Sequence, residues 1–463
     1  MMGIFKKEYK SLFLAGLFSL AFFITPLYIQ AQDDSGGESI KPEMLMDVNT
    51  SKDFFKSLQV SVIEHPIFLS SEANIAQSKE VLNIAKAPRR PQVSLFGSTT
   101  NRMQSSYDDR FSFFESSPIK DRTSTGILIE QLLFDFFSTK YQINEARNNL
   151  LAEEVVQEQK INSLLLKMIT SCLDTASYDI LKDLLRDSVR RHTEITEKIR
   201  IRVESGRAPT RELSRANARL AEAEAKLLRI ELNYDSAKAE FMQLMPNIKA
   251  CSQMIDLDQS DLSMDENQVI EMAINSNLNI KEVDLRIKAA KENVSKQRSN
   301  FWPRLNLTLQ GDLYNPEYYM TKKLEEHDIY LGIQFQTELY TGGRKNSQLR
   351  IAREQLNQLS YDRSTLAKDI TSNIESLLSE LKNADNRVKA YESAFYANGK
   401  SRDNLNLQFE TSNVSLLELL QAERDLIESA ENMVFNQRSV ILSGYTQKAI
   451  LGQLKSYVEN SSK

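Results

Sequence analysis

Two stretches of the chain contain neither glycine nor proline over lengths that ordinary globular helices do not reach. They cover residues 127–205 and 344–398, whereas a typical helix has about 11–12 residues. In the second stretch apolar side chains recur every three or four residues, and Arg363 is the one polar residue in this heptad seam. A helix over residues 138–204 would be on the order of 100 Å long at about 1.5 Å per residue. The sequence therefore predicts long helices packed in a layer of coiled helices.

The composition and charge agree with this prediction. Charged residues make up 26% of the 463 residues, with only 14 glycines and 10 prolines, as expected for long solvated helices. The length would allow about three ordinary domains, but helices of this length favour one elongated body. The net charge of −5 gives no reason to expect nucleic acid as a partner.

The first 31 residues have the features of a secretory signal peptide. They combine a basic start, an apolar core and a small residue, Ala31, before a polar one. The alternative is an uncleaved membrane anchor, although Thr25 and Pro26 interrupt the apolar run. No cysteine lies near the cleavage point, so lipid attachment there is not expected. The predicted mature chain begins with a polar, disordered lead over residues 32–50.

The remaining chain repeats one pattern at an offset of about 210 residues. An offset of 212 places Pro91 on Pro303, and an offset of 204 places Phe136 on Tyr340. Each copy has the same order of parts: a helix, two strands, a very long helix and a returning helix. The sequence therefore predicts two structural repeats whose length differences lie in the loops.

The predicted boundaries are as follows. The first repeat (51–245) has a helix over 54–87, strands at about 91–104 and 123–136, the long helix at about 138–204, a tip at 205–209 and a returning helix over 210–245. The second repeat (266–452) has a helix over 266–299, strands at about 303–314 and 328–340, the long helix at about 343–410, a tip at 411–415 and a returning helix over 416–450. A linker (246–265) joins the repeats, a tail (453–463) follows them, and two outer loops are expected at 104–122 and 315–326.

The predicted third and fourth strands each have one apolar and one polar face. Leu305, Leu307 and Leu309 alternate with polar residues, and Ile329 and Leu331 do the same in the fourth strand. A strand of about ten residues with two such faces suits a membrane barrel, with lipid outside and water inside. The alternative is an amphipathic hairpin in a soluble sandwich.

Aromatic residues gather where the predicted strands meet the helices, which favours the membrane alternative. They are Phe134, Phe136, Phe137, Tyr340 and the single tryptophan, Trp302, as in an aromatic belt at a membrane interface. Four strands cannot close a barrel, because even the smallest bacterial barrels have about eight. The strand edges must therefore be paired by other copies of the chain.

Three segments resemble those of a known family. They are the junction Leu339-Tyr340-Thr341-Gly342-Gly343-Arg344, the strand entry Trp302-Pro303-Arg304-Leu305 and the tip segment at residues 416–422. Because they occur in the family's order within a doubled architecture, nearly the whole mature chain is similar to the TolC family. The members of this family are outer-membrane channels of bacterial efflux and type I secretion systems.

The resemblance implies a fold, an assembly and a location. The fold is mostly helical with a small membrane β part. Three chains form a twelve-stranded β-barrel in the outer membrane of a Gram-negative bacterium, continued by a twelve-helix tunnel through the periplasm. The implied partners are two more copies of the chain, outer-membrane lipid, a periplasmic adaptor (membrane fusion protein) and an inner-membrane pump of the RND or ABC type.

The two tips match a family pattern of a glycine, an acidic residue six positions later and an alanine four positions after that. The first tip has Gly206, Glu212 and Ala216, whereas the second has Ser412 in place of the glycine, followed by Glu418 and Ala422. The resemblance implies that these tips close the tunnel at rest and dock the adaptor.

A ring of three Glu418 side chains at such a constriction would attract cations. Some relatives have a second acidic position three residues later, where this chain has Gln421, so a double acidic ring is not expected. The alternative is that Glu212 and Glu418 are first-turn carboxylates that interact favourably with their helix dipoles. Both interpretations can hold together.

No constellation of residues points to a metal, a cofactor or catalysis. The three histidines, His65, His192 and His327, are widely spaced and have no cysteine or carboxylate at ligand spacing. Neither a glycine-rich phosphate loop nor a nucleophile elbow occurs. The sequence therefore does not predict an enzyme.

The two cysteines are predicted to lie at the same height. Cys172 precedes the first tip by 33 residues and Cys251 closely follows the returning helix, so both fall about 50 Å from the tip at helical rise. Because an export route is oxidising, we predict a disulfide that ties the linker to the long helix. The alternative is two separate small buried side chains.

These observations favour a passive conduit through the outer membrane and periplasm, opened by one partner and powered by another. The leading alternative is a secreted or periplasmic coiled-coil scaffold without a pore, against which the strand alternation and the aromatic belt speak. An enzyme is the least favoured class. Nothing in the sequence identifies the transported substrate.

Overall fold

The first predicted long helix is a single helix in the structure. α3 (Ser138–Glu204) has 67 residues, and neither glycine nor proline interrupts it. The structure is a computed structural model that describes residues 44–101, 121–246, 251–256, 266–314, 327–411 and 414–462. The predicted signal peptide, most of the two predicted outer loops and Ser412 lie outside these residues.

The second long helix is divided, so the prediction of one helix over residues 343–410 is wrong. α7 (Arg344–Lys382) and α8 (Ala384–Glu410) are separated by Asn383, whose backbone is not helical. Asparagine has a low helix propensity because its side chain competes for backbone hydrogen bonds. Near the break, the Arg387 side chain donates a hydrogen bond to the carbonyl oxygen of Glu380 (3.4 Å).

Two shorter predicted helices are also divided. Residues 54–87 belong to α1 (Val48–Glu64), α2 (Pro66–Lys86) and the short 3₁₀ helix that follows. The break between α1 and α2 lies at His65, because Pro66 disfavours a helical backbone at the residue before it. Residues 266–299 form α5 (Glu266–Ser276) and α6 (Leu278–Ser299), and Asn277 caps α6. The predicted tail contains one more helix, α10 (Leu454–Ser461).

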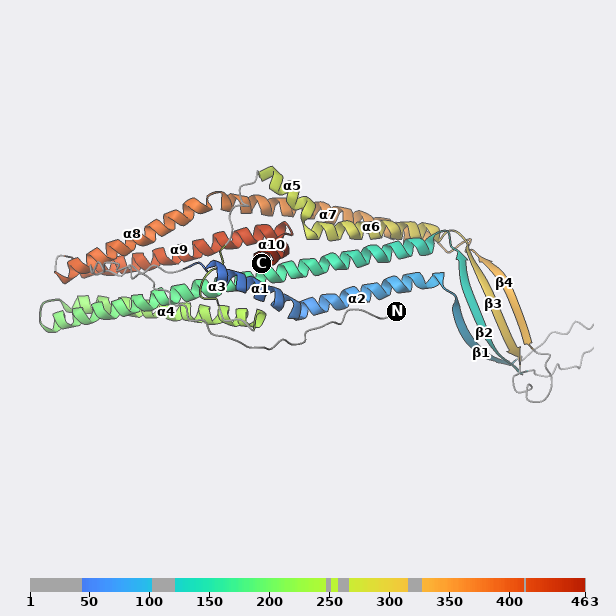
Figure 1. Cartoon of the computed structure of the whole chain (residues 1–463), viewed down its shortest axis with the longest axis horizontal. Helices are drawn as coiled ribbons and strands as arrows, with labels where there is room; N and C mark the ends of the chain where they lie inside the picture. Colours follow the sequence, from blue (N-terminus) through green and yellow to red (C-terminus); the bar gives the residue numbers. More distant parts are fainter. Residues whose placement is uncertain are drawn as a thin grey trace, which may run out of the picture. The chain divides into compact units, whose positions relative to one another are not determined.

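The returning helices lie against the long helices (Figure 1). α4 (Thr210–Leu244) packs along α3, and α9 (Leu416–Ile450) packs on both α8 and α3. α6 lies between α3 and α7, where Asp284 pairs with Arg363 at 2.6 Å. Arg363, the polar residue of the seam, is therefore satisfied at a helix interface. Within the described part of the chain, no helix is both long and apolar enough to cross a membrane.

The four strands form one antiparallel sheet in the order β1-β2-β3-β4. They are β1 (Gln92–Asn101), β2 (Asp121–Phe134), β3 (Arg304–Tyr314) and β4 (His327–Gln336), so β4 ends four residues before the predicted boundary. The β2–β3 pairing joins the two repeats, since β2 comes from the first and β3 from the second. The predicted fold class, mostly helical with four antiparallel strands in two repeats, is confirmed.

The sheet has the two faces that the alternation predicts. On one face, apolar side chains are exposed over both edge strands, for example Leu95 at 78% and Leu331 at 68%. The pairing Leu309↔Leu331 continues this face across β3, and Gln92, Glu130 and other polar residues occupy the opposite face. Among the described strands, β1 and β4 each have one edge that no other strand pairs.

Candidate functional site

The first tip is a tight turn built around Gly206. α3 ends at Glu204, and Gly206 adopts a left-handed backbone with φ of 71°, which glycine reaches without a steric cost. The amide of Arg207 donates to the carbonyl oxygen of Arg202 (2.8 Å), closing the end of the helix. Glu212 lies in the first turn of α4, where a carboxylate interacts favourably with the helix dipole.

At the second tip, Ser415 and Glu418 cap α9 together. The amide of Glu418 donates to the Ser415 hydroxyl (3.4 Å), and that hydroxyl donates to the Glu418 carboxylate (3.0 Å). The Gln421 amide donates to Asp425 (2.8 Å). Glu418 therefore serves its own helix start, as the dipole interpretation expects; its role at a constriction stays a prediction.

Polar contacts and a small apolar core join the two hairpins near the tips. Lys198 of α3 pairs with Glu410 of α8 at 2.8 Å, and the hydrogen bond from Lys198 lowers the pKa of Glu410 below its ordinary value. The Arg202 guanidinium lies 4.5 Å from the centre of the Phe409 ring. The core beside them contains Ile195, Ile199, Ala216, Phe409, Leu416, Leu419 and Leu420.

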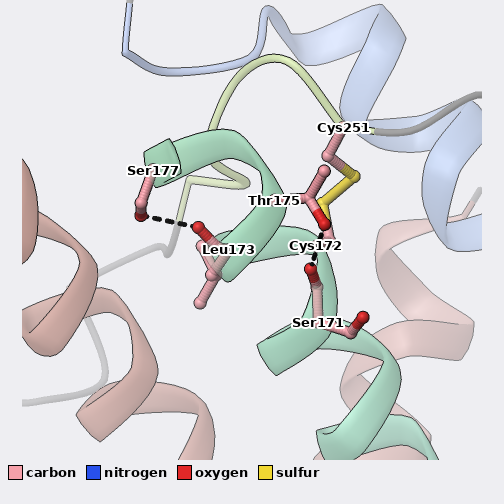
Figure 2. The surroundings of a disulfide bond; sticks show 6 residues. All are labelled: Ser171, Cys172, Leu173, Thr175, Ser177 and Cys251. Atoms are coloured by element: carbon pink, nitrogen blue, oxygen red, sulfur yellow. Dashed lines mark hydrogen bonds between the residues drawn. A yellow bond between two sulfur atoms is a disulfide. The ribbon is translucent and has the colours of Figure 1, made fainter. Parts of the chain in front are cut away.

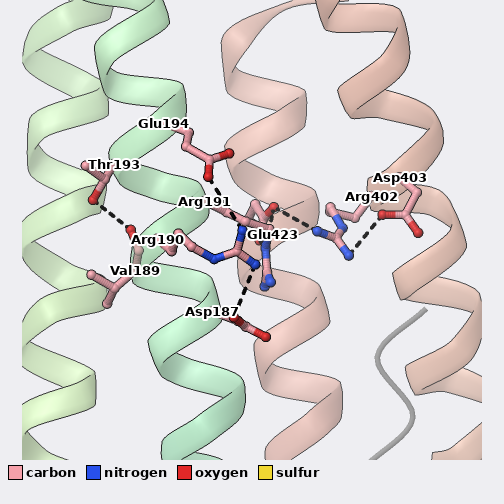
Figure 3. Close-up of polar contacts among 9 residues, drawn as sticks. All are labelled: Asp187, Val189, Arg190, Arg191, Thr193, Glu194, Arg402, Asp403 and Glu423. Carbon is pink, nitrogen blue, oxygen red and sulfur yellow. Dashed lines mark hydrogen bonds and ion pairs between the residues drawn. The ribbon is translucent and has the colours of Figure 1, made fainter. Parts of the chain in front are cut away.

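A buried ion cluster lies farther along the helices from the tips, where α3, α8 and α9 meet (Figure 3). The Glu423 side chain is 2% exposed, and its two oxygens accept hydrogen bonds from Nε of Arg191 at 3.0 and 3.1 Å. Arg402 of α8 reaches the same carboxylate at 3.6 Å and also pairs with Asp403 at 2.9 Å. One buried carboxylate thus joins three helices from both repeats.

Sequence reasoning missed this cluster, although one signal was present. Glu423 interrupts the apolar positions of α9, where Leu419, Ala422 and Leu426 are buried. A charge on an apolar helix face is expected to have a partner, because an unpaired buried charge is strongly unfavourable. The sequence alone does not say which arginine supplies it.

His192 adjoins the cluster, and the stability of the tips is expected to depend on pH through this side chain. Burial lowers the pKa of His192 below its ordinary value, Glu423 opposes this shift and Arg191 reinforces it. The unfolded chain therefore binds a proton more readily, so stability should be full above about pH 6.5 and decline below it, by at most about 1.4 kcal/mol per pH unit. Thermal unfolding of the wild type and of His192→Gln across this range tests the prediction. A wild-type slope that His192→Gln leaves unchanged would contradict it.

The two strand-to-helix junctions use the same backbone with different residues. Phe136 and Phe137 have φ of 52° and 66°, and Gly342 and Gly343 have 61° and 85° at the equivalent positions before α3 and α7. Phe136 is therefore equivalent to Gly342, and not to Tyr340 as the sequence alignment predicted. A left-handed backbone is unfavourable for phenylalanine, whereas the glycines adopt it freely.

Aromatic packing holds the first junction in this conformation. Phe136 stacks on Trp302, with ring centres 5.0 Å apart and planes 18° apart, and Phe134 contacts both Phe136 and Phe137. Pro303 follows Trp302 and leads directly into β3. Tyr340 belongs to the second junction, where it is 88% exposed, so the described chain does not gather all the predicted belt residues into one cluster.

Cys172 and Cys251 form a disulfide in the structure (Figure 2). Their Cα atoms are 5.3 Å apart, and both side chains are buried. The bond fastens the short segment at residues 251–256 to α3. The same segment is held by a hydrogen bond from the Tyr445 hydroxyl to the carbonyl oxygen of Asp256 (2.8 Å) and by a bridge between Met254 and Leu45.

The family model of outer membrane efflux proteins matches residues 58–246 and 269–444, most of the chain and both repeats. The chain belongs to this family. It is an outer-membrane efflux channel that extends into the periplasm, and the family is a non-enzymatic transport family. Channels of the TolC type form trimers that work with an adaptor and a pump.

Known relatives resemble this efflux channel over most of their length. The outer membrane efflux protein BepC of Brucella suis is 22% identical over 83% of this chain and 82% of its own. The outer membrane protein TolC of Salmonella enteritidis is 20% identical over 88% and 83%. The crystal structure of the Campylobacter jejuni CmeC outer membrane channel has the same fold, with a TM-score of 0.78, 13% identity and coverage of 93% and 94%.

The described part of the channel brings no metal-binding residues together. The three histidines lie on different elements: His65 accepts a hydrogen bond from the amide of Ile67 at the start of α2, His192 adjoins the ion cluster in α3 and His327 begins β4. Within these described residues there is no group of three potential metal ligands.

Proposed function

We propose that three copies of this efflux channel enclose one continuous conduit, with twelve strands in the outer membrane and twelve helices in the periplasm. The observation that carries the proposal is the sheet, whose apolar face is exposed while two edges have no partner within the described chain. Exposed strand edges and an exposed apolar face are both satisfied when β4 of one copy pairs with β1 of the next in a lipid bilayer.

The same proposal gives the remaining parts their roles. The signal peptide (1–31) is removed, the repeats at residues 51–245 and 266–452 each supply half of the chain's share of the wall, and the linker (246–265) lies outside it. The aromatic residues at the junctions, Trp302 and Tyr340 among them, meet the membrane interface. The partners are a membrane fusion protein as adaptor and an RND or ABC pump in the inner membrane.

At the periplasmic end, the proposal assigns the resting closure to the second tip. Three copies of Glu418, which lie at the exposed start of α9, would form an acidic ring that concentrates cations in a narrow pore. Gly206 and Glu212 shape the first tip, and Gln421 stands where a second acidic ring at the second tip would need a carboxylate.

Planar-bilayer recording tests the conduit and the gate separately. We expect a small wild-type conductance that favours cations, and a larger, less cation-selective conductance in Glu418→Ala. Glu212→Ala is the matched control, because it removes a first-turn carboxylate from the other tip and should change the conductance less. Absence of any conductance would argue against the conduit, whereas equal conductance in Glu418→Ala and wild type would remove Glu418 from the gate.

A further inference from the structure

The two tips carry opposite charge. Residues 198–219, around the first tip, contain seven lysines and arginines and two glutamates. Residues 403–423, around the second, contain four acidic residues and no lysine or arginine. Helix-terminus preferences do not account for this difference, since both segments run through one helix end and one helix start.

Most of the basic residues at the first tip already have partners in the chain. Those with a partner are Lys198 on Glu410, Arg200 on Glu197, Arg202 on Phe409 and Arg219 on Glu222. Three others, the arginine stripe (Arg207, Arg211 and Arg215), are exposed. None of the three meets a carboxylate or another hydrogen-bond acceptor among the described residues.

The stripe has a defined direction on the hairpin. Arg211 and Arg215 are four residues apart in α4, so their side chains lie on one side of that helix, and Arg207 precedes them in the turn. The buried side of the same turns faces the other hairpin through Ala216, which contacts the core formed with Leu416 and Leu419. The stripe is therefore presented away from the apolar contact that joins the two hairpins.

Another copy of the chain is a poor partner for the stripe. The carboxylates of its second tip are already engaged in the chain that carries them. These pairs are Asp403 with Arg402, Glu410 with Lys198, Glu418 with Ser415, Glu423 with Arg191 and Asp425 with Gln421. Pairing with a neighbour would break these contacts, and two first tips would repel each other.

We propose that the arginine stripe is a docking surface for carboxylate side chains at the end of the adaptor, an inference that rests on the proposed function. An arginine fork binds a carboxylate through two parallel hydrogen bonds. Complementary charge also speeds encounter and fixes the register of two partners. The adaptor element that meets the first tip is therefore acidic, and the six tips of a trimer are not equivalent docking sites.

The test compares two channel variants with the same change in charge. The probe is the adaptor of the source bacterium, purified without its membrane anchor, and its binding to the detergent-solubilised channel is measured at low and high salt. Arg211→Glu with Arg215→Glu should weaken binding at least about tenfold. The control, Arg229→Glu with Lys238→Glu, changes two exposed residues farther along α4 and should leave binding within about twofold.

Further readouts separate this inference from the proposed function. The stripe variant should remain a trimer and conduct in bilayers like the wild type, and replacing the adaptor's terminal carboxylates by lysine should restore its binding. Unchanged affinity of the stripe variant, equal weakening by the control, or loss of the trimer would overturn the inference. A wild-type channel that conducts but does not bind this adaptor would also overturn it, while leaving the conduit itself intact.

Discussion

Glu423→Ala should lower the free energy of unfolding of the tip hairpins by about 3–5 kcal/mol, the usual effect of removing one partner from a buried ion pair. The substitution leaves Arg191 and Arg402 without their shared carboxylate, and both side chains are only 11–12% exposed. Because α3, α8 and α9 meet at this carboxylate, the loss should appear in both hairpins. Hydrogen exchange of the three helices and chemical denaturation measure it.

Two comparisons make this prediction specific. Glu194→Ala removes an exposed partner of Arg190 and should change stability by less than about 1 kcal/mol. Replacing the cluster as a whole, by Glu423→Leu with Arg191→Met and Arg402→Met, should recover most of the lost stability, since apolar replacements of buried ion pairs are often neutral or stabilising. If Glu423→Ala unfolds like the wild type, the cluster does not hold the hairpins together.

Removing the disulfide by Cys172→Ala with Cys251→Ala should have an effect of similar size. The two residues are 79 positions apart, and the entropy of closing a loop of this length corresponds to about 4.5 kcal/mol. The segment at residues 251–256 should also become more accessible to proteases, because it loses its covalent tie to α3 and keeps only non-covalent contacts such as the Tyr445 hydrogen bond and the bridge to Leu45. Denaturation and limited proteolysis of the oxidised, reduced and substituted proteins provide the measurements.

Non-reducing peptide mapping is the direct check on this bond in the protein from the outer membrane. We expect one peptide pair that contains Cys172 and Cys251. Two free thiols would show that the cysteines are separate buried side chains, and reduction would then leave stability and proteolysis unchanged.

The sequence predicted the structure most accurately where the local residue pattern determines the backbone conformation. The absence of glycine and proline predicted α3, and strict alternation predicted the faces of β3 and β4. Gly206 predicted the first tip because a left-handed residue is needed to end the helix there. Each of these signals depends on local steric preferences or on the spacing of apolar residues, and both can be read from a single sequence.

The errors occur where a local signal is weak or where distant contacts override local preference. Asn383 ends α7 without a proline or glycine nearby, and asparagine inside a helix is common enough that the residue gave no clear signal. Phe136 and Phe137 adopt a left-handed backbone that is unfavourable for phenylalanine, and the packing of Phe136 on Trp302 and of Phe137 on Phe134 holds them there. The partners of Glu423 lie 21 and 232 residues away in the chain, so pattern and spacing could not identify them.

Cysteine cross-linking between neighbouring copies tests the central claim most directly. One cysteine is placed in β1 at Gln92 or Ser94 and one in β4 at Gln334 or Gln336, all on the polar face and at the same end of the sheet. If three copies close the barrel, oxidation of the protein in outer membranes will yield covalent trimers for at least one pair, and none for the single-cysteine variants. A trimeric outer-membrane channel would be contradicted if every pair yielded only monomers and the chain were recovered without detergent.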